Sequence, residues 1–76
     1  MIDVLFFAEL QETVGNEKVS MEADGMTVKA LKEKLSAAYD LSLDHAMIAI
    51  NQEYAAEDAM ITNGDVVAFI PPVSGG

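Results

Sequence analysis

The chain has 76 residues and is therefore expected to fold as one small domain over residues 1–76. Hydrophobic residues make up 51% of it, which is enough for a core and too much for a disordered chain. The formal net charge is −9, from 13 acidic residues against four lysines and no arginine. This balance argues against partners that present phosphates, so neither nucleic acid nor an anionic membrane surface is expected.

The composition also restricts the compartment and the kinds of site. Without cysteine the chain can form neither disulfides nor thiolate metal sites, which suits a cytoplasmic protein. No apolar run approaches the roughly 20 residues of a membrane span, and the opening MIDVLFFAEL lacks the basic head of a signal peptide. The excess of acids has two interpretations: it keeps the protein soluble, or it attracts a basic partner.

The first third of the chain predicts a β-hairpin. Residues 2–8 (IDVLFFA) are β-rich and almost continuously apolar, which is typical of a strand covered on both faces. Residues 9–15 predict one helical turn that ends at Gly15. The alternation of apolar and polar side chains in residues 19–23 then predicts a half-buried edge strand.

A single longer helix is predicted next. Residues 24–25 (Asp-Gly) turn the chain, and Thr27 is placed as the N-cap of a helix that runs to about Tyr39. Lys32 and Lys34 are expected to flank its apolar stripe, where their stems can cover apolar surface. The stripe is predicted to consist of Val28, Leu31, Leu35, Ala38 and Tyr39.

The last third predicts two or three strands. Residues 46–50 (AMIAI) are a strand followed by a turn at residues 51–52, and residues 53–61 are compatible with a short strand or a turn. Residues 63–64 (Asn-Gly) are a strong turn signal before the last strand, residues 66–70 (VVAFI). The element order predicts an α+β fold of the β-grasp (ubiquitin-like) type, a mixed four- to five-stranded sheet packed on one main helix.

One face of this sheet is left without a cover. In the first strand Ile2, Val4 and Phe6 point to one side, whereas Leu5 and Phe7 share the other side with Asp3 and are expected to face outward. An exposed apolar face commonly marks a protein partner. The alternative is that residues 52–62 cover it.

Catalytic machinery is not evident inside the chain. His45 is the only histidine and is predicted to lie at the surface. Together with Asp44 it would supply only two metal ligands, so no metal site is predicted. No glycine-rich phosphate loop follows a strand, and no bound cofactor is expected.

The carboxyl-terminal sequence PPVSGG has more specific features. Pro71 and Pro72 end the last strand and stiffen the base of a projecting, flexible tail of residues 71–76. Gly75 and Gly76 have no Cβ, so their backbone can pass through a slot too narrow for a side chain. The α-carboxylate of Gly76 is anionic at neutral pH and can attack the α-phosphate of ATP. A partner enzyme must hold that ATP, and the alternative is that Gly-Gly is only a frayed end.

Four stretches, VLFFAEL, TVKALKEKL, AINQE and above all NGDVVAFIPPVSGG, resemble the small subunit of molybdopterin synthase. The resemblance implies that an activating enzyme of the ubiquitin-activating type uses ATP to adenylate Gly76, which then becomes a thiocarboxylate. The tail residues Pro71, Pro72, Val73, Ser74 and Gly75 would insert into the large subunit. There Gly76 would give sulfur to cyclic pyranopterin monophosphate for molybdenum cofactor synthesis.

The same resemblance implies the assembly and its contacts. The synthase is a heterotetramer with two large subunits at its centre, and the small subunit acts as a non-catalytic sulfur carrier. Phe7, Tyr54 and Ile70, with Leu5, are implied as the contacts of the sheet with the large subunit. Three alternatives stay open: a sulfur carrier for thiamine synthesis, a ubiquitin-like protein modifier joined through Gly76 to lysines, and a binding module without tail chemistry.

Overall fold

A computed structural model describes residues 1–43 and 45–72 of the chain. Its elements are β1 (Ile2–Phe6), α1 (Glu9–Val14), β2 (Lys18–Met21), α2 (Val28–Tyr39), β3 (Met47–Ile50), β4 (Glu53–Tyr54) and β5 (Val66–Ile70). This order confirms the predicted one, although the first strand ends two residues before the predicted Ala8. Within these ranges, neither helix combines the length and the apolar character that a membrane crossing requires.

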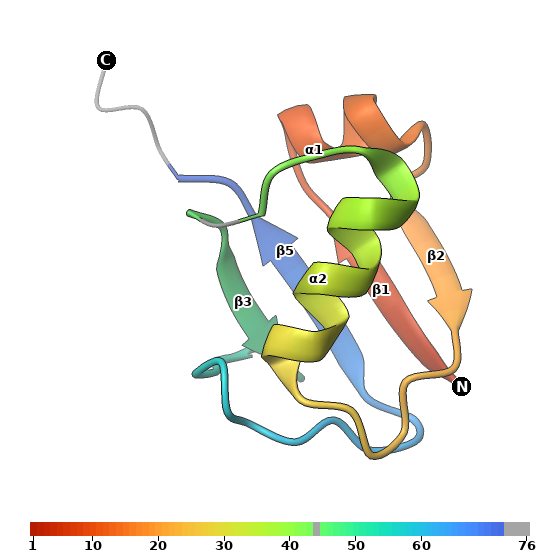
Figure 1. The fold of residues 1–76 in the computed structure, drawn as a ribbon, viewed down its shortest axis with the longest axis vertical. Helices are drawn as coiled ribbons and strands as arrows, with labels where there is room; N and C mark the ends of the chain where they lie inside the picture. Colours follow the sequence, from red (N-terminus) through yellow and green to blue (C-terminus); the bar gives the residue numbers. More distant parts are fainter. Residues whose placement is uncertain (44, 73–76) are drawn as a thin grey trace.

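The five strands form one mixed sheet in the order β2-β1-β5-β3-β4. β1 and β5 are parallel, and the other neighbouring pairs are antiparallel. Figure 1 shows α2 crossing one face of this sheet, with β1 and β5 behind it and β2 and β3 to either side. The predicted β-grasp architecture, with one main helix on one face of a mixed sheet, is confirmed.

The core lies between α2 and the inner face of the sheet. β1 and β5 contribute their inward residues in register, since Phe6 pairs with Phe69 on the neighbouring strand. The rings of these two residues stack with centroids 5.9 Å apart, and Tyr39 at the end of α2 meets Phe6 edge-on at 6.2 Å. The other fully buried core residues include Ile2, Val4, Val28, Leu31, Leu43, Ile61 and Val67.

The helix begins and ends as predicted, but its buried stripe is displaced. The Thr27 hydroxyl accepts a hydrogen bond from the Ala30 N–H at 3.2 Å, which confirms the N-cap. Ala38 is exposed, so its placement on the stripe was wrong, and Lys32 is buried instead. Successive residues of a helix are about 100° apart around its axis. Lys32 therefore lies only about 40° from Val28 around the axis, whereas Ala38 lies about 80° from Val28 in the opposite direction.

The loop between β4 and β5 packs on the start of α2. The carbonyls of Glu57 and Ala59 accept hydrogen bonds from the first helical N–H groups, those of Lys29 and Val28, at 2.9 and 3.0 Å. Lys32 Nζ also donates to Glu57 Oε1 at 2.8 Å, and this lysine lowers the pKa of the Glu57 carboxyl. The loop is therefore fastened to the helix side of the molecule and leaves the opposite face of the sheet uncovered.

Candidate functional site

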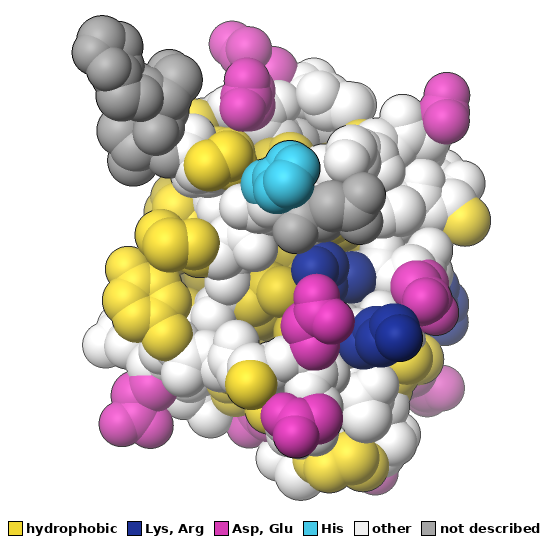
Figure 2. Space-filling model, turned by 60° about the vertical axis from the view of Figure 1, so that its left-hand side comes forward, with side chains coloured by type: hydrophobic (Ala, Val, Ile, Leu, Met, Phe, Trp, Pro, Cys, Tyr) yellow, Lys and Arg dark blue, Asp and Glu magenta, His cyan; other side chains and the backbone are white. Residues whose placement is uncertain are grey.

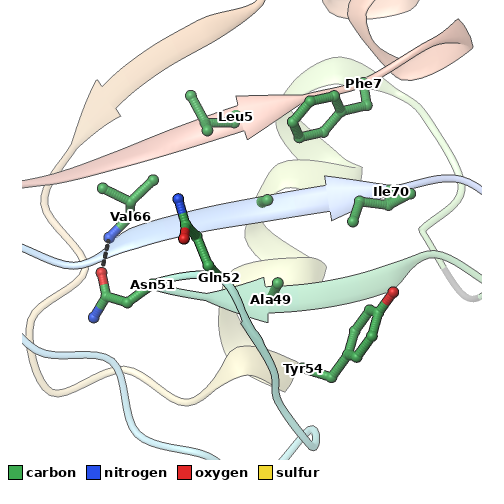
Figure 3. Close-up of a pocket in the computed structure, with 9 residues that line it drawn as sticks. Leu5, Phe7, Ala49, Asn51, Gln52, Tyr54, Val66 and Ile70 are labelled. Atoms are coloured by element: carbon green, nitrogen blue, oxygen red, sulfur yellow. Dashed lines mark hydrogen bonds between the residues drawn. The ribbon is translucent and has the colours of Figure 1, made fainter.

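The face of the sheet opposite α2 contains an open hollow of about 550 Å³. Figure 3 shows side chains from β1, β5, β3 and β4 standing around it, with α2 behind the sheet. We call it the outer hollow. It is lined by Leu5, Phe7, Ala49, Asn51, Gln52, Tyr54, Val66, Ala68 and Ile70.

The hollow exists because small residues occupy the middle of this face. Ala68 on β5 pairs with Ala49 on β3 and with Leu5 on β1, so two methyl groups lie side by side on the floor. Larger side chains stand at the rim. Phe7 is 45% exposed and Tyr54 is 75% exposed, although both carry an aromatic ring. Exposed aromatic side chains around a shallow apolar floor are typical of a protein-binding surface.

One end of the hollow is fixed by a hydrogen-bond network. The Asn51 side chain accepts a hydrogen bond from the Val66 N–H at 3.0 Å and donates one to Asp65 Oδ1 at 3.0 Å. Asp65 Oδ2 also accepts from the Thr62 N–H at 2.9 Å. The hydrogen bonds from Thr62 and then Asn51 lower the pKa of the Asp65 carboxyl, because they stabilise its ionised form. This network joins the β3–β4 turn to the start of β5.

Polarity changes across the outer face. None of the nine residues that line the hollow is charged at neutral pH. Towards β2 the same face is polar, because Asp3 accepts a hydrogen bond from Ser20 at 2.8 Å and lies 3.9 Å from Lys18 Nζ. Figure 2 shows hydrophobic side chains gathered at the β3 side of the molecule, apart from the lysines and acids over α2. A partner that covers the hollow therefore meets a mainly apolar surface with a polar margin.

The structure brings together the four predicted contacts of the sheet. Leu5, Phe7, Tyr54 and Ile70 all line the outer hollow, although they come from three different strands or their ends. Sequence reasoning missed Ala49, Asn51, Gln52, Val66 and Ala68. Ala49, Val66 and Ala68 could have been found from the sequence, because alternate side chains of a strand point to the same face and this fixes the outward positions of β3 and β5. For the turn residues there was no such signal.

The tail begins at the rim of this hollow. Ile70 is the last residue of β5 and lines the hollow, and Pro71 and Pro72 follow it at half-buried and exposed positions. The predicted tail residues Val73, Ser74, Gly75 and Gly76 lie outside the described residues. Whatever covers the hollow therefore lies next to the point where residues 71–76 begin.

His45 is exposed, as predicted. Its suggested metal-binding companion, Asp44, lies outside the described residues. Among residues 1–43 and 45–72, no three histidine, aspartate or glutamate side chains come close enough together to hold a metal ion.

Comparison with known proteins gives consistent results. The model of the ThiS family matches residues 4–76. The molybdopterin synthase sulfur carrier subunit of Escherichia coli is 43% identical to this chain over 81 aligned residues, and the alignment covers 100% of both chains. Both matches extend to Gly76, the last residue of the chain.

Solved structures agree in fold. SAMP1 from Haloferax volcanii is 30% identical with a TM-score of 0.75, covering 99% of this chain and 98% of the other. A chain in the complex of subunits 1 and 2 of molybdopterin-converting factor from Helicobacter pylori is 27% identical with a TM-score of 0.70, covering 99% and 97%. From its sequence and its fold alike, the chain belongs to the ThiS family, and it is a relative of molybdopterin synthase sulfur carrier subunits over its whole length.

Proposed function

We propose that this protein is the sulfur-carrier subunit of a cytoplasmic molybdopterin synthase. The proposal rests on the relationship to the Escherichia coli sulfur carrier subunit and on one structural observation. The strand that carries the tail, β5, also supplies Val66, Ala68 and Ile70 to the outer hollow. A large subunit docked on the hollow would therefore be positioned to receive residues 71–76.

The chemistry takes place at Gly76. An oxygen of its carboxylate attacks the α-phosphorus of ATP, pyrophosphate leaves, and an acyl adenylate forms. Sulfide provided by a sulfur donor then attacks the glycyl carbonyl, displaces AMP and loses its proton, which leaves a thiocarboxylate. Both steps occur on a ubiquitin-activating-like adenylyltransferase, because this chain contributes the reacting carboxylate and not the phosphate site.

The sulfur is then delivered inside the large subunit. The thiocarboxylate sulfur displaces an oxygen substituent from a carbon of cyclic pyranopterin monophosphate, and hydrolysis of the bond between this sulfur and the Gly76 carbonyl restores the carboxylate. Gly75 and Gly76 give the tail a cross-section no wider than the backbone, which suits a narrow entrance. Two deliveries supply the dithiolene, in line with a heterotetramer of two large and two small subunits. On this proposal the carrier needs no cofactor of its own.

An extension by one residue after Gly76 tests the proposal. The added residue replaces the glycyl carboxylate at the tip, so we expect sulfur transfer to be abolished while the thermal midpoint stays unchanged. The measurement is molybdopterin formation with the purified activating enzyme and large subunit. The control carries the same extra residue before Met1 and should keep its activity. Molybdopterin formation by the variant extended after Gly76 would rule out the carrier role.

A second candidate, a protein modifier, is favoured by the likeness to SAMP1 from Haloferax volcanii, since a further solved structure from H. volcanii, 27% identical to this chain, is described as small archaeal modifier protein 1. The two functions leave different products. Intact-mass measurement of the protein from its own cells should show one oxygen replaced by sulfur at Gly76 in a carrier. Gly76 in isopeptide linkage to lysines of other proteins would favour the modifier instead.

A further inference from the structure

The hairpin turn between β3 and β4 has an unusual backbone. Its two-residue loop places Asn51 at φ 52° and Gln52 at φ 72°. Positive φ at both central positions is the pattern of a type I′ turn, in which Asn-Gly is strongly preferred. Asparagine tolerates this region, but glutamine at the second position carries a steric cost that glycine would avoid.

The two turn residues use their side chains differently. Both polar ends of the Asn51 amide are engaged, with the Val66 N–H and with Asp65. In the described part of the chain, no hydrogen bond involves the Gln52 side chain. Figure 3 shows this side chain rising from the turn towards β5, and it lines the outer hollow together with Val66. Gln52, whose backbone is strained, therefore extends over the apolar surface of the hollow an amide that makes no hydrogen bond within the described residues.

A stabilising role inside the fold does not explain this arrangement. The turn is already fastened by Asn51, whose backbone N–H also donates to the Val66 carbonyl at 2.8 Å. Gln52 is exposed and adds no such link. Strain that is retained at an exposed residue beside a binding surface suggests a functional reason for the side chain.

We propose that Gln52 is a specificity-determining residue of the outer hollow, whose amide hydrogen-bonds a peptide group of the docked large subunit. This inference rests on the proposed function, because it takes the large subunit as the occupant. A primary amide offers both a donor and an acceptor, as a peptide group does, so one side chain can satisfy both groups of a partner backbone. Once the large subunit covers the hollow, the apolar residues there keep water away from the amide, so that losing the pair leaves the partner's peptide unsatisfied.

The test is the substitution Gln52→Gly, for which stability and binding should change in opposite directions. Relief of the backbone strain is expected to raise the thermal midpoint by roughly 3–6 °C. Loss of the amide is expected to weaken binding to the purified large subunit by about 5- to 100-fold. The measurements are thermal unfolding by circular dichroism and titration calorimetry with the large subunit. If Gln52 had only a structural role, Gln52→Gly would lower the thermal midpoint and the affinity for the large subunit together.

Two further variants serve as controls. Asp40→Gly relieves the same kind of strain, since Asp40 has φ 52° at the end of α2, away from the residues that line the hollow. It should raise the thermal midpoint and leave the affinity unchanged. Gln52→Met keeps the length of the side chain and the strain but removes the amide, so the affinity should fall while the thermal midpoint stays within about a degree.

The outcomes separate this inference from the proposed function. If the unchanged protein does not bind the large subunit, the proposed function fails. If the unchanged protein binds, and Gln52→Gly and Gln52→Met bind equally well, the assignment of Gln52 is wrong while the proposed function stands. A drop in both stability and affinity for Gln52→Gly would also overturn the assignment.

Discussion

Neighbouring phenylalanines in the first strand region have opposite roles. Phe6 is buried against Phe69 and Tyr39, whereas Phe7 is 45% exposed at the rim of the outer hollow. The period of two along a strand is enough to separate them, and Asp3 shows which side faces out because it shares a face with Phe7. At this scale the sequence was sufficient to predict which phenylalanine packs in the core and which lies outside it.

Substitution at Phe7 should therefore affect binding far more than folding. For Phe7→Glu we expect the affinity for the large subunit to fall by at least about 30-fold, because an apolar contact is replaced by a carboxylate that must lose its water. The free energy of unfolding should change by no more than about 1 kcal/mol. The measurements are titration calorimetry and chemical denaturation.

The matched control is Phe69→Ala, which removes a fully buried ring from the same sheet. It should lower the free energy of unfolding by about 3–5 kcal/mol. A comparable loss of stability in Phe7→Glu would identify Phe7 as a core residue and contradict its assignment to the binding surface.

At the scale of the elements, the sequence pattern predicted β1, β2, β3, β5 and both helices, and it left β4 open between a strand and a turn. It did not predict which lysine is buried. Lys32 lies on the buried arc of α2 because its stem packs there while its ammonium reaches Glu57 at 2.8 Å on a loop 25 residues away. A partner so distant in sequence leaves no periodic signal. Ala38 was misplaced for the converse reason, since an alanine fits either face of a helix.

The turn between β3 and β4 shows another limit of sequence reasoning. The pair at residues 51–52 was predicted to be a turn, yet nothing in the sequence indicated that Gln52 would extend over the outer hollow. That position depends on the register of β3 with β5, in which Ala49 lies opposite Ala68. Long-range register is a property of the assembled sheet, so the site's turn residues appear only in the structure.

The network that fastens this turn predicts a pH dependence. Hydrogen bonds from Thr62 and Asn51 lower the pKa of the Asp65 carboxyl below its ordinary 3.8. The unfolded chain therefore takes up this proton first as the pH falls. The stability contributed by the Asp65 carboxylate is complete above 3.8 and is lost as the pH falls through the lower pKa of the folded state.

Asp65→Asn should remove this contribution. Its thermal midpoint should lie below that of the unchanged protein at neutral pH, and the difference should narrow below pH 3.8. Thermal unfolding across pH 2–7 checks it. Asp58→Asn, an equal change of charge at an exposed position, should show a nearly constant difference. A constant difference for Asp65→Asn as well would mean that its hydrogen bonds do not depend on the charge.

At the scale of the whole molecule, charge and apolar surface are separated. The formal net charge is −9, yet the outer hollow is lined only by uncharged residues. The electrostatic attraction between an acidic protein and a basic partner extends over a Debye length, roughly 8 Å at physiological salt, whereas apolar contacts form only after docking. The two features should therefore affect different steps of binding.

We expect salt to slow association with the large subunit and to leave dissociation nearly unchanged. Raising the salt concentration from below to above the physiological value should lower the association rate constant by roughly tenfold if the partner's docking face is basic. The dissociation rate constant should change less than about twofold. Stopped-flow fluorescence measures both. An association rate that does not respond to salt would indicate that the acids only keep the protein in solution.

The central position of β5 has a consequence for the newly made protein. This strand lies between β1 and β3, so the β1–β2 and β3–β4 hairpins cannot be joined into one sheet before residues 66–70 have left the ribosome. A nascent chain interrupted earlier lacks both ladders and the hollow itself, and it remains open to proteolysis.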